Sequence, residues 1–123
     1  MTAYLDNSAT TPVCSEAVEA MKTAVTELWG NPSSLHQKGI EADEMLENAR
    51  SNVARRLFCR DDEVYFTSGG TESNNLAVQG AAHAMRRRGR RIVTTSVEHP
   101  SIDETVKHLE HEGFEVIRLG VDK

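Results

Sequence analysis

The feature that most constrains the fold is an alternation of short β-rich runs with helical patterns in the second half of the chain. The β-rich runs are Glu63–Thr67, Ile92–Ser96 and Phe114–Leu119. Helical patterns over about 71–88 and 100–112 lie between them, and Gly89 and Gly113 end these patterns. Strands that alternate with helices predict an α/β fold with a sheet that is at least partly parallel.

The first half of the chain carries helical patterns only. Apolar residues recur at helical spacing over about 15–29 and 35–58, after an extended lead-in. Ser15 is expected to cap the first helix, and Ser33 or Ser34 the second, because a serine hydroxyl can accept a hydrogen bond from the first turn of a helix.

Composition limits the class of protein. The chain has 123 residues and a net charge of −5, and this mild acidity argues against a dedicated nucleic-acid binder. No apolar run approaches the roughly 18 residues of a membrane-spanning helix, and no signal peptide is visible at the start. Two cysteines without a CxxC motif are expected to be free thiols, which predicts a cytoplasmic protein.

The glycine-containing turn at Thr67–Asn75 is the most informative segment for chemistry. It connects an expected strand to an expected helix, and Gly69 and Gly70 let the backbone approach a ligand closely. A helix start offers free N–H groups and a positive dipole end, and the Thr71 hydroxyl adds a donor, so the segment fits a phosphate. The pattern fits an ordinary strand-to-helix turn as well, and spacing alone leaves both interpretations open.

His99 follows the second expected strand, at the edge of an α/β sheet where ligands collect. An imidazole there can stack on a flat ring or move protons. The alternative is a loop histidine that serves local hydrogen bonds at the next helix, for which Ser101 and Glu104 form a possible capping box.

Three other groups are interpreted as structural. His108 and His111 have no third ligand at a sensible spacing, so no metal site is expected. The arginine-rich run at 86–91 is interpreted as cations at a helix C-terminus. Cys14 and Cys59 are interpreted as ordinary small hydrophobic residues.

Four segments resemble motifs of the NifS/IscS-like cysteine desulfurases, within the class V aminotransferase superfamily. They are YLDNSATTP at Tyr4–Pro12, GNPSSLHQKG at Gly30–Gly39, FTSGGTESNN at Phe66–Asn75 and VEHP at Val97–Pro100. They occur in the family's order and together span essentially the whole chain, which makes them specific as a set.

The resemblance implies a pyridoxal-phosphate enzyme of fold type I. Residues 1–60 would be a lead-in with two helices, and residues 61–123 the first part of an incomplete large domain with a mixed, mostly parallel sheet flanked by helices. Such enzymes convert L-cysteine to L-alanine and pass the sulfur, as a protein persulfide, to an acceptor protein for iron–sulfur cluster or thiolation pathways. The resemblance also implies a homodimer.

The resemblance also assigns residues. Gly70 and Thr71 would bind the cofactor phosphate, and His99 would stack on the pyridine ring and assist proton transfer. The segments around Asn7 and at 31–36 would lie near the active site.

Three functional groups of the family have no match here. These are the Schiff-base lysine, the aspartate that pairs with the pyridine nitrogen and the mobile-loop cysteine that takes the sulfur. We therefore expect an N-terminal fragment that is inactive alone and exposes sheet edges, with the strand at 64–67 lying apart from the other two. Alternatives are a fragment of another class V enzyme (a selenocysteine lyase or an aminotransferase) and a stand-alone, non-catalytic binding fragment.

Overall fold

The computed structural model describes residues 3–122, which divide into two compact units between Tyr65 and Phe66. This division lies close to the boundary expected after residue 60, while the assignment of each unit to a domain of a larger enzyme stays a prediction. Among the described residues, no helix is both long enough and apolar enough to cross a membrane.

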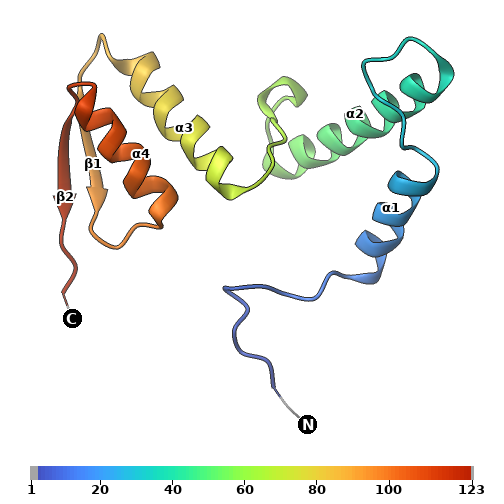
Figure 1. Ribbon diagram of the computed structural model, residues 1–123, viewed down its shortest axis with the longest axis horizontal. Coiled ribbons are helices and arrows are strands. Elements are labelled where there is room, and N and C mark those ends of the chain that lie inside the picture. The colour runs from blue at the N-terminus through green and yellow to red at the C-terminus, as the bar shows by residue number, and fades with distance from the viewer. Residues whose placement is uncertain (1–2, 123) are drawn as a thin grey trace. The chain divides into compact units, whose positions relative to one another are not determined.

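The first unit is helical. It contains α1 (Ser15–Thr26), α2 (Gln37–Leu57) and a short 3-10 helix, η1 (Asp61–Glu63) (Figure 1). Both expected long helices form, and each is shorter than predicted.

The serine caps expected for these helices are wrong. Cys14 and His36 stand at the two N-cap positions, and neither side chain makes a capping hydrogen bond. Ser33 and Ser34 instead belong to a turn around Asn31. The Asn31 side chain accepts the Ser33 N–H at 2.9 Å, and the Asn31 carbonyl accepts the Ser34 N–H at 2.9 Å.

Two glycines hold the turn before α2 against the start of that helix. A Cβ atom on Gly30 would lie 2.0 Å from the Lys38 carbonyl oxygen, and one on Gly39 would lie 2.1 Å from the Ser34 carbonyl oxygen. Both contacts are far closer than a Cβ atom tolerates. Close backbone approach, rather than helix propensity, therefore requires glycine at these positions.

The second unit is an α/β unit. It contains α3 (Gly70–Met85), β1 (Arg91–Thr95), α4 (Pro100–His111) and β2 (Glu115–Leu119), and the two strands pair in parallel with Ile92 opposite Val116. This pairing confirms the α/β fold and the predicted neighbours at 92–96 and 114–119.

The strand expected at Glu63–Thr67 is wrong, because no strand forms there within residues 3–122. Local hydrogen bonds satisfy the first backbone N–H groups of this run instead. The Arg60 carbonyl accepts the Glu63 N–H at 3.0 Å, and the Asp61 carbonyl accepts the Val64 N–H at 3.2 Å. The sheet is completed by β1 and β2 alone, so the residues after η1 join no ladder.

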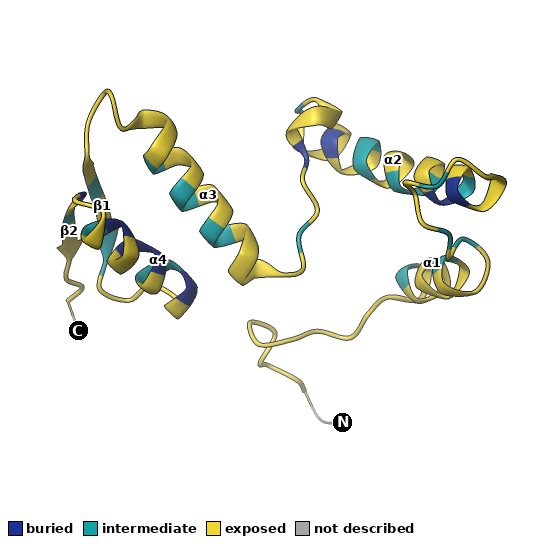
Figure 2. Ribbon diagram, turned by 45° about the horizontal axis from the view of Figure 1, so that its top comes forward, coloured by how far each residue is buried: buried dark blue, intermediate teal, exposed yellow. Residues whose placement is uncertain are grey.

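The core of the second unit lies along one face of α4. Val106 and Leu109 are fully buried there, and Phe114 packs at the start of β2 (Figure 2). Next to this core, Arg118 from β2 forms two hydrogen bonds with the Glu110 carboxylate, at 2.8 and 2.7 Å. Val93 and Ile117 remain exposed on the sheet, as expected for an uncovered apolar face.

We expect Gly39→Ala to lower the free energy of unfolding by about 1–3 kcal/mol, because the new methyl group forces the turn away from α2. Gly80→Ala is the matched control. Gly80 lies within α3 and faces open space, so alanine there should be neutral or stabilise the helix by up to about 1 kcal/mol. Urea unfolding followed by circular dichroism measures both variants; equal effects would contradict the close-packing argument.

The hydrogen bonds between Arg118 and Glu110 predict that the stability of the fold depends on pH. Hydrogen bonds from Arg118 hold the pKa of Glu110 below its ordinary 4.5. A lowered pKa in the folded state means that this stabilisation is present above pH 4.5 and disappears as the pH falls through the lower folded-state value. The loss of melting temperature between about pH 6 and about pH 3 should therefore be smaller in Glu110→Gln than in the wild type. Glu44→Gln, at a carboxylate with no ion pair among residues 3–122, should lose as much as the wild type.

Candidate functional site at the start of two helices

The turn before α3 presents free backbone donors. Gly69 is the N-cap residue, and its carbonyl accepts the Ser73 N–H at 3.1 Å. Within residues 3–122, the N–H groups of Gly70, Thr71 and Glu72 donate to no acceptor. These three donors and the positive end of the α3 dipole favour an anion at this point.

Side chains within the turn fix its shape. The Glu72 carboxylate accepts the Ser68 hydroxyl at 2.6 Å and the Ser68 N–H at 2.7 Å, and these hydrogen bonds lower the pKa of Glu72. The Thr67 and Ser73 hydroxyl groups lie 2.6 Å apart. The one carboxylate of the turn is therefore charged and bonded to Ser68.

The residues present fit a phosphate group. A Cβ atom on Gly69 or Gly70 would meet nothing within 4 Å, so open space lies beside the free N–H groups. Thr71 is exposed next to them, and its hydroxyl is a further donor. The predicted phosphate-binding residues thus lie where an anion can reach them.

His99 occupies the N-cap of α4. Its Nδ1 atom accepts the Ser101 N–H at 3.2 Å and lies 2.8 Å from the Ser101 hydroxyl. The expected helix-capping interpretation of His99 is therefore confirmed, and the alternative capping box of Ser101 with Glu104 does not form. Because the ring remains exposed, capping does not prevent it from contacting a ligand.

Polar side chains join the starts of α3 and α4. Asn74 donates to the Ser101 hydroxyl at 2.8 Å, and the Thr105 hydroxyl donates to Asn75 at 2.7 Å. Ser101 and Thr105 are buried. The two helices run in the same direction (Figure 1), so these bonds bring Gly70, Thr71 and His99 to one end of the second unit.

Sequence reasoning missed this polar seam. The phosphate motif contains Asn74 and Asn75 but assigns neither an individual role, and no motif includes Thr105. A usable signal was present in the four-residue spacing of Ser101 and Thr105, which puts two small hydroxyl side chains on one face of a helix.

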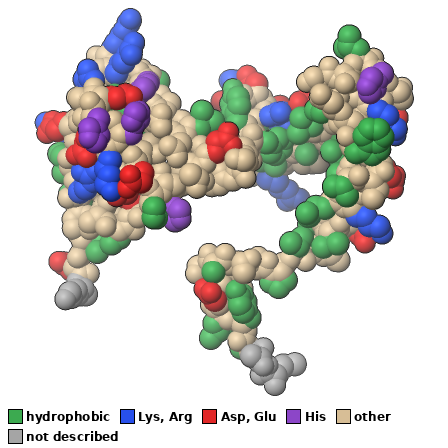
Figure 3. Space-filling model, viewed as in Figure 1, with side chains coloured by type: hydrophobic (Ala, Val, Ile, Leu, Met, Phe, Trp, Pro, Cys, Tyr) green, Lys and Arg blue, Asp and Glu red, His purple; other side chains and the backbone are tan. Residues whose placement is uncertain are grey.

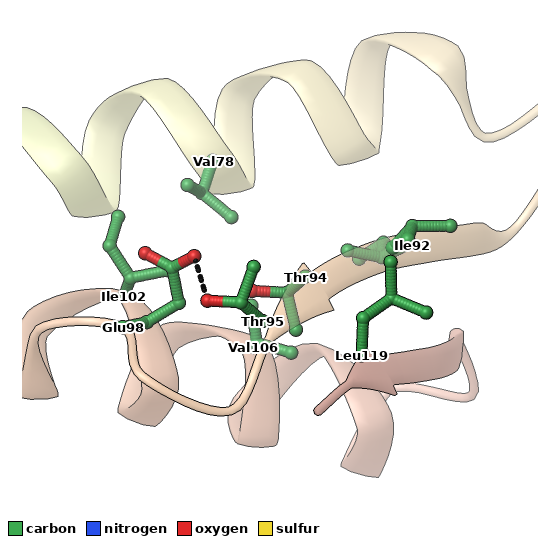
Figure 4. A pocket seen from close by; sticks show the side chains of 9 residues that line it. Val78, Ile92, Thr94, Thr95, Glu98, Ile102, Val106 and Leu119 are labelled. Carbon is green, nitrogen blue, oxygen red and sulfur yellow. Dashed lines mark hydrogen bonds between the residues drawn. The ribbon is translucent and has the colours of Figure 1, made fainter. Parts of the chain in front are cut away.

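A separate open pocket of about 300 Å³ lies between α3, α4 and the sheet. Its walls are mainly apolar, with Val78, Ile92 and Leu119 among them, and Glu98 accepts the Thr95 hydroxyl at 2.7 Å at one side (Figure 4). Neither Gly70, Thr71 nor His99 lines this pocket, so it is distinct from the donor cluster.

The cysteines and the histidines of α4, which are the other candidate functional residues, do not lie together in one site. Cys14 is exposed and Cys59 half-buried, both as free thiols. His108 pairs with Glu112 at 3.1 Å, His111 contacts the Lys107 carbonyl at 2.8 Å, and residues 3–122 contain no cluster of three metal ligands.

Basic side chains gather where α3 is followed by β1 (Figure 3). Arg90 lies 5.0 Å from the centre of the Phe114 ring, and Arg91 pairs with Glu115 at 2.9 Å. These two arginines of the run therefore have structural partners.

The other two motifs lie in the first unit. The Asn7 side chain donates to the Tyr4 carbonyl at 3.5 Å, within an exposed lead-in. Asn31 organises the turn before α2, and His36 is the N-cap of that helix. Their proximity to an active site stays a prediction.

Comparisons with known proteins identify the family of this chain. The family model for aminotransferase class V matches residues 3–123. A NifS/IcsS protein homologue of Lactobacillus delbrueckii subsp. bulgaricus is 53% identical over 98% of this chain, and the cysteine desulfurase IscS of Dictyoglomus turgidum is 47% identical over the same share. The chain covers 31% and 30% of these two relatives, so it spans about a third of their length.

Solved structures show the same likeness. A NifS-like protein superposes with a TM-score of 0.86 at 41% identity, over 97% of this chain and 33% of its own. SspA, solved in complex with cysteine, superposes with a TM-score of 0.83 at 36% identity, over 96% of this chain and 34% of its own. The chain therefore belongs to the aminotransferase class V family, in which it is similar to the NifS- and IscS-like cysteine desulfurases.

Proposed function

We propose that this chain forms the phosphate- and ring-binding part of a pyridoxal-phosphate-dependent cysteine desulfurase. Such an enzyme converts L-cysteine to L-alanine and transfers the sulfur as a persulfide. The observation that carries the proposal is the shared end of α3 and α4, where free N–H groups and an exposed imidazole lie in one unit. Relatives named cysteine desulfurase, and a similar structure solved with cysteine, support the choice of substrate.

The start of α3 would hold the cofactor phosphate. The N–H groups of Gly70 and Thr71 and the Thr71 hydroxyl would donate to its oxygens, and the helix dipole would favour its charge. Glu72 would not compete for these donors, because its carboxylate is bonded to Ser68.

His99 would orient the ring and exchange protons with a bound ligand. Because Ser101 fixes the Nδ1 side of the imidazole, the exposed Nε2 side is the one that can act on a ligand. Bound pyridoxal phosphate supplies the electron sink that the chemistry requires, and the protein contributes binding and orientation.

The covalent groups would come from residues beyond these 123. Lys22, Lys38 and Lys107 each pair with a carboxylate. Lys107 donates hydrogen bonds to the carboxylates of Asp103 and Glu104, which raise its pKa to about 12, so it is a poor nucleophile. We propose that a lysine and a sulfur-accepting cysteine elsewhere in a larger cytoplasmic assembly complete the site. In this proposal, the assembly is a homodimer that serves an acceptor protein in iron–sulfur cluster or thiolation pathways.

The phosphate site predicts a preference that calorimetry can measure. Pyridoxine 5′-phosphate and pyridoxine carry no aldehyde, so neither reacts with lysines. We expect the phosphorylated compound to bind the chain at least about tenfold more tightly, because charge-assisted hydrogen bonds each contribute about 1.5 kcal/mol or more.

Thr71→Ala should reduce this preference several-fold, since it removes the hydroxyl donor. Thr23→Ala, at an exposed threonine in α1, is the matched control and should leave the preference unchanged. Equal binding of the two compounds by the wild type, or equal effects of the two variants, would refute the proposed phosphate site.

A further inference from the structure

Residues behind His99 determine which of its two ring nitrogens carries the hydrogen. The chain of contacts runs from Asn74 on α3 to the Ser101 hydroxyl, at 2.8 Å, and from that hydroxyl to His99 Nδ1, at 2.8 Å. Ser101 is only 7% exposed, and Asn74 is half-buried. Both contacts are therefore part-buried.

The hydrogen count of these groups decides the direction of each bond. A serine hydroxyl has one hydrogen, and its oxygen here accepts from the Asn74 amide. The hydroxyl hydrogen is therefore available to His99 Nδ1, which also accepts the Ser101 N–H at 3.2 Å. A ring nitrogen that accepts two donors cannot carry a hydrogen, so the hydrogen of the neutral ring lies on Nε2.

We infer that Asn74 is a positioning residue that, through Ser101, holds neutral His99 as the Nε2–H tautomer. Nε2 has no hydrogen-bond partner among residues 3–122, and the ring is exposed. His99 therefore presents a hydrogen-bond donor toward solvent or a ligand. This inference rests on the proposed function for its catalytic meaning: neutral His99 would present an Nε2–H hydrogen-bond donor to the cofactor or substrate.

The role of Asn74 follows from its being an amide. Its NH₂ group can only donate to Ser101, which leaves the hydroxyl hydrogen for the imidazole. An aspartate has the same shape but only accepts. In Asn74→Asp the hydroxyl hydrogen would turn toward the carboxylate, and Ser101 would then accept a hydrogen from Nδ1.

The test is nuclear magnetic resonance of the imidazole nitrogens in the ¹⁵N-histidine-labelled full chain, without cofactor. Spectra are taken at about pH 8.5, above the ordinary histidine range. His99→Gln assigns the signals of His99, and the chain in urea gives the tautomer ratio of an unconstrained histidine. We expect the wild type to show predominantly Nε2–H, well above the ratio in urea.

The variants separate a directed hydrogen bond from added charge. Asn74→Asp should raise the ratio of Nδ1–H to Nε2–H about fivefold, the range that one ordinary hydrogen bond supports. Asn75→Asp introduces the same charge one residue away, where the side chain bonds Thr105 and not Ser101. It should leave the His99 ratio near that of the wild type.

Ser101→Ala gives a second, independent test in case Asn74→Asp does not fold. Loss of the hydroxyl donor should move the ratio toward that in urea, with only the backbone N–H left to favour the tautomer. A wild-type ratio equal to that in urea, an unchanged ratio in both Asn74→Asp and Ser101→Ala, or equal shifts in the two aspartate variants would each overturn the inference. Because no cofactor is present, these results are independent of whether pyridoxine 5′-phosphate binds.

Discussion

The polar seam between α3 and α4 is the constraint on which the site depends. Hydrogen bonds between Asn74 and Ser101 and between Asn75 and Thr105 join the two helices in one register. The half-buried Asn74 and Asn75 side chains would lose these partners if the helices shifted, and this cost favours the observed register. The starts of both helices therefore remain at one end of the unit.

This register places two different chemical functions together. The start of α3 offers backbone donors and a positive dipole end, which suit an anion, while the start of α4 offers an imidazole that is fixed at Nδ1 and exposed elsewhere. A small aromatic molecule that carries a phosphate satisfies both. Neither helix start would distinguish such a ligand from a simple anion or a simple ring.

The sequence predicts the parts of this architecture that depend on periodicity. Alternating strand and helix patterns predict the parallel pairing of β1 with β2, and Gly69 and Gly70 mark the turn before α3. The predicted serine caps, which depend on competition between local hydrogen bonds, are wrong. Asn31 draws Ser33 and Ser34 into a turn before either can cap α2.

Long-range partners explain the remaining errors. The β-rich run at 63–67 has the composition of a strand. The N–H groups of Glu63 and Val64 are bonded to carbonyls at η1, however, and the sheet forms from β1 and β2 without this run. Asn74 is polar within a helix, and a single sequence does not distinguish a solvent-facing asparagine from one that meets a buried serine 27 residues later. The residues proposed to contact a ligand could thus be named from the sequence, whereas those that position them could not.

The most direct test of a site formed by the two helix starts is a residue-resolved titration of the ¹⁵N-labelled chain with pyridoxine 5′-phosphate, followed through the backbone amide signals. We expect the largest shifts at Gly70 and Thr71 and around His99, with little change at the arginine-rich end of α3. Shifts centred on residues 86–91 would show that the phosphate is attracted by the arginines alone, and would contradict a site formed by the two helix starts.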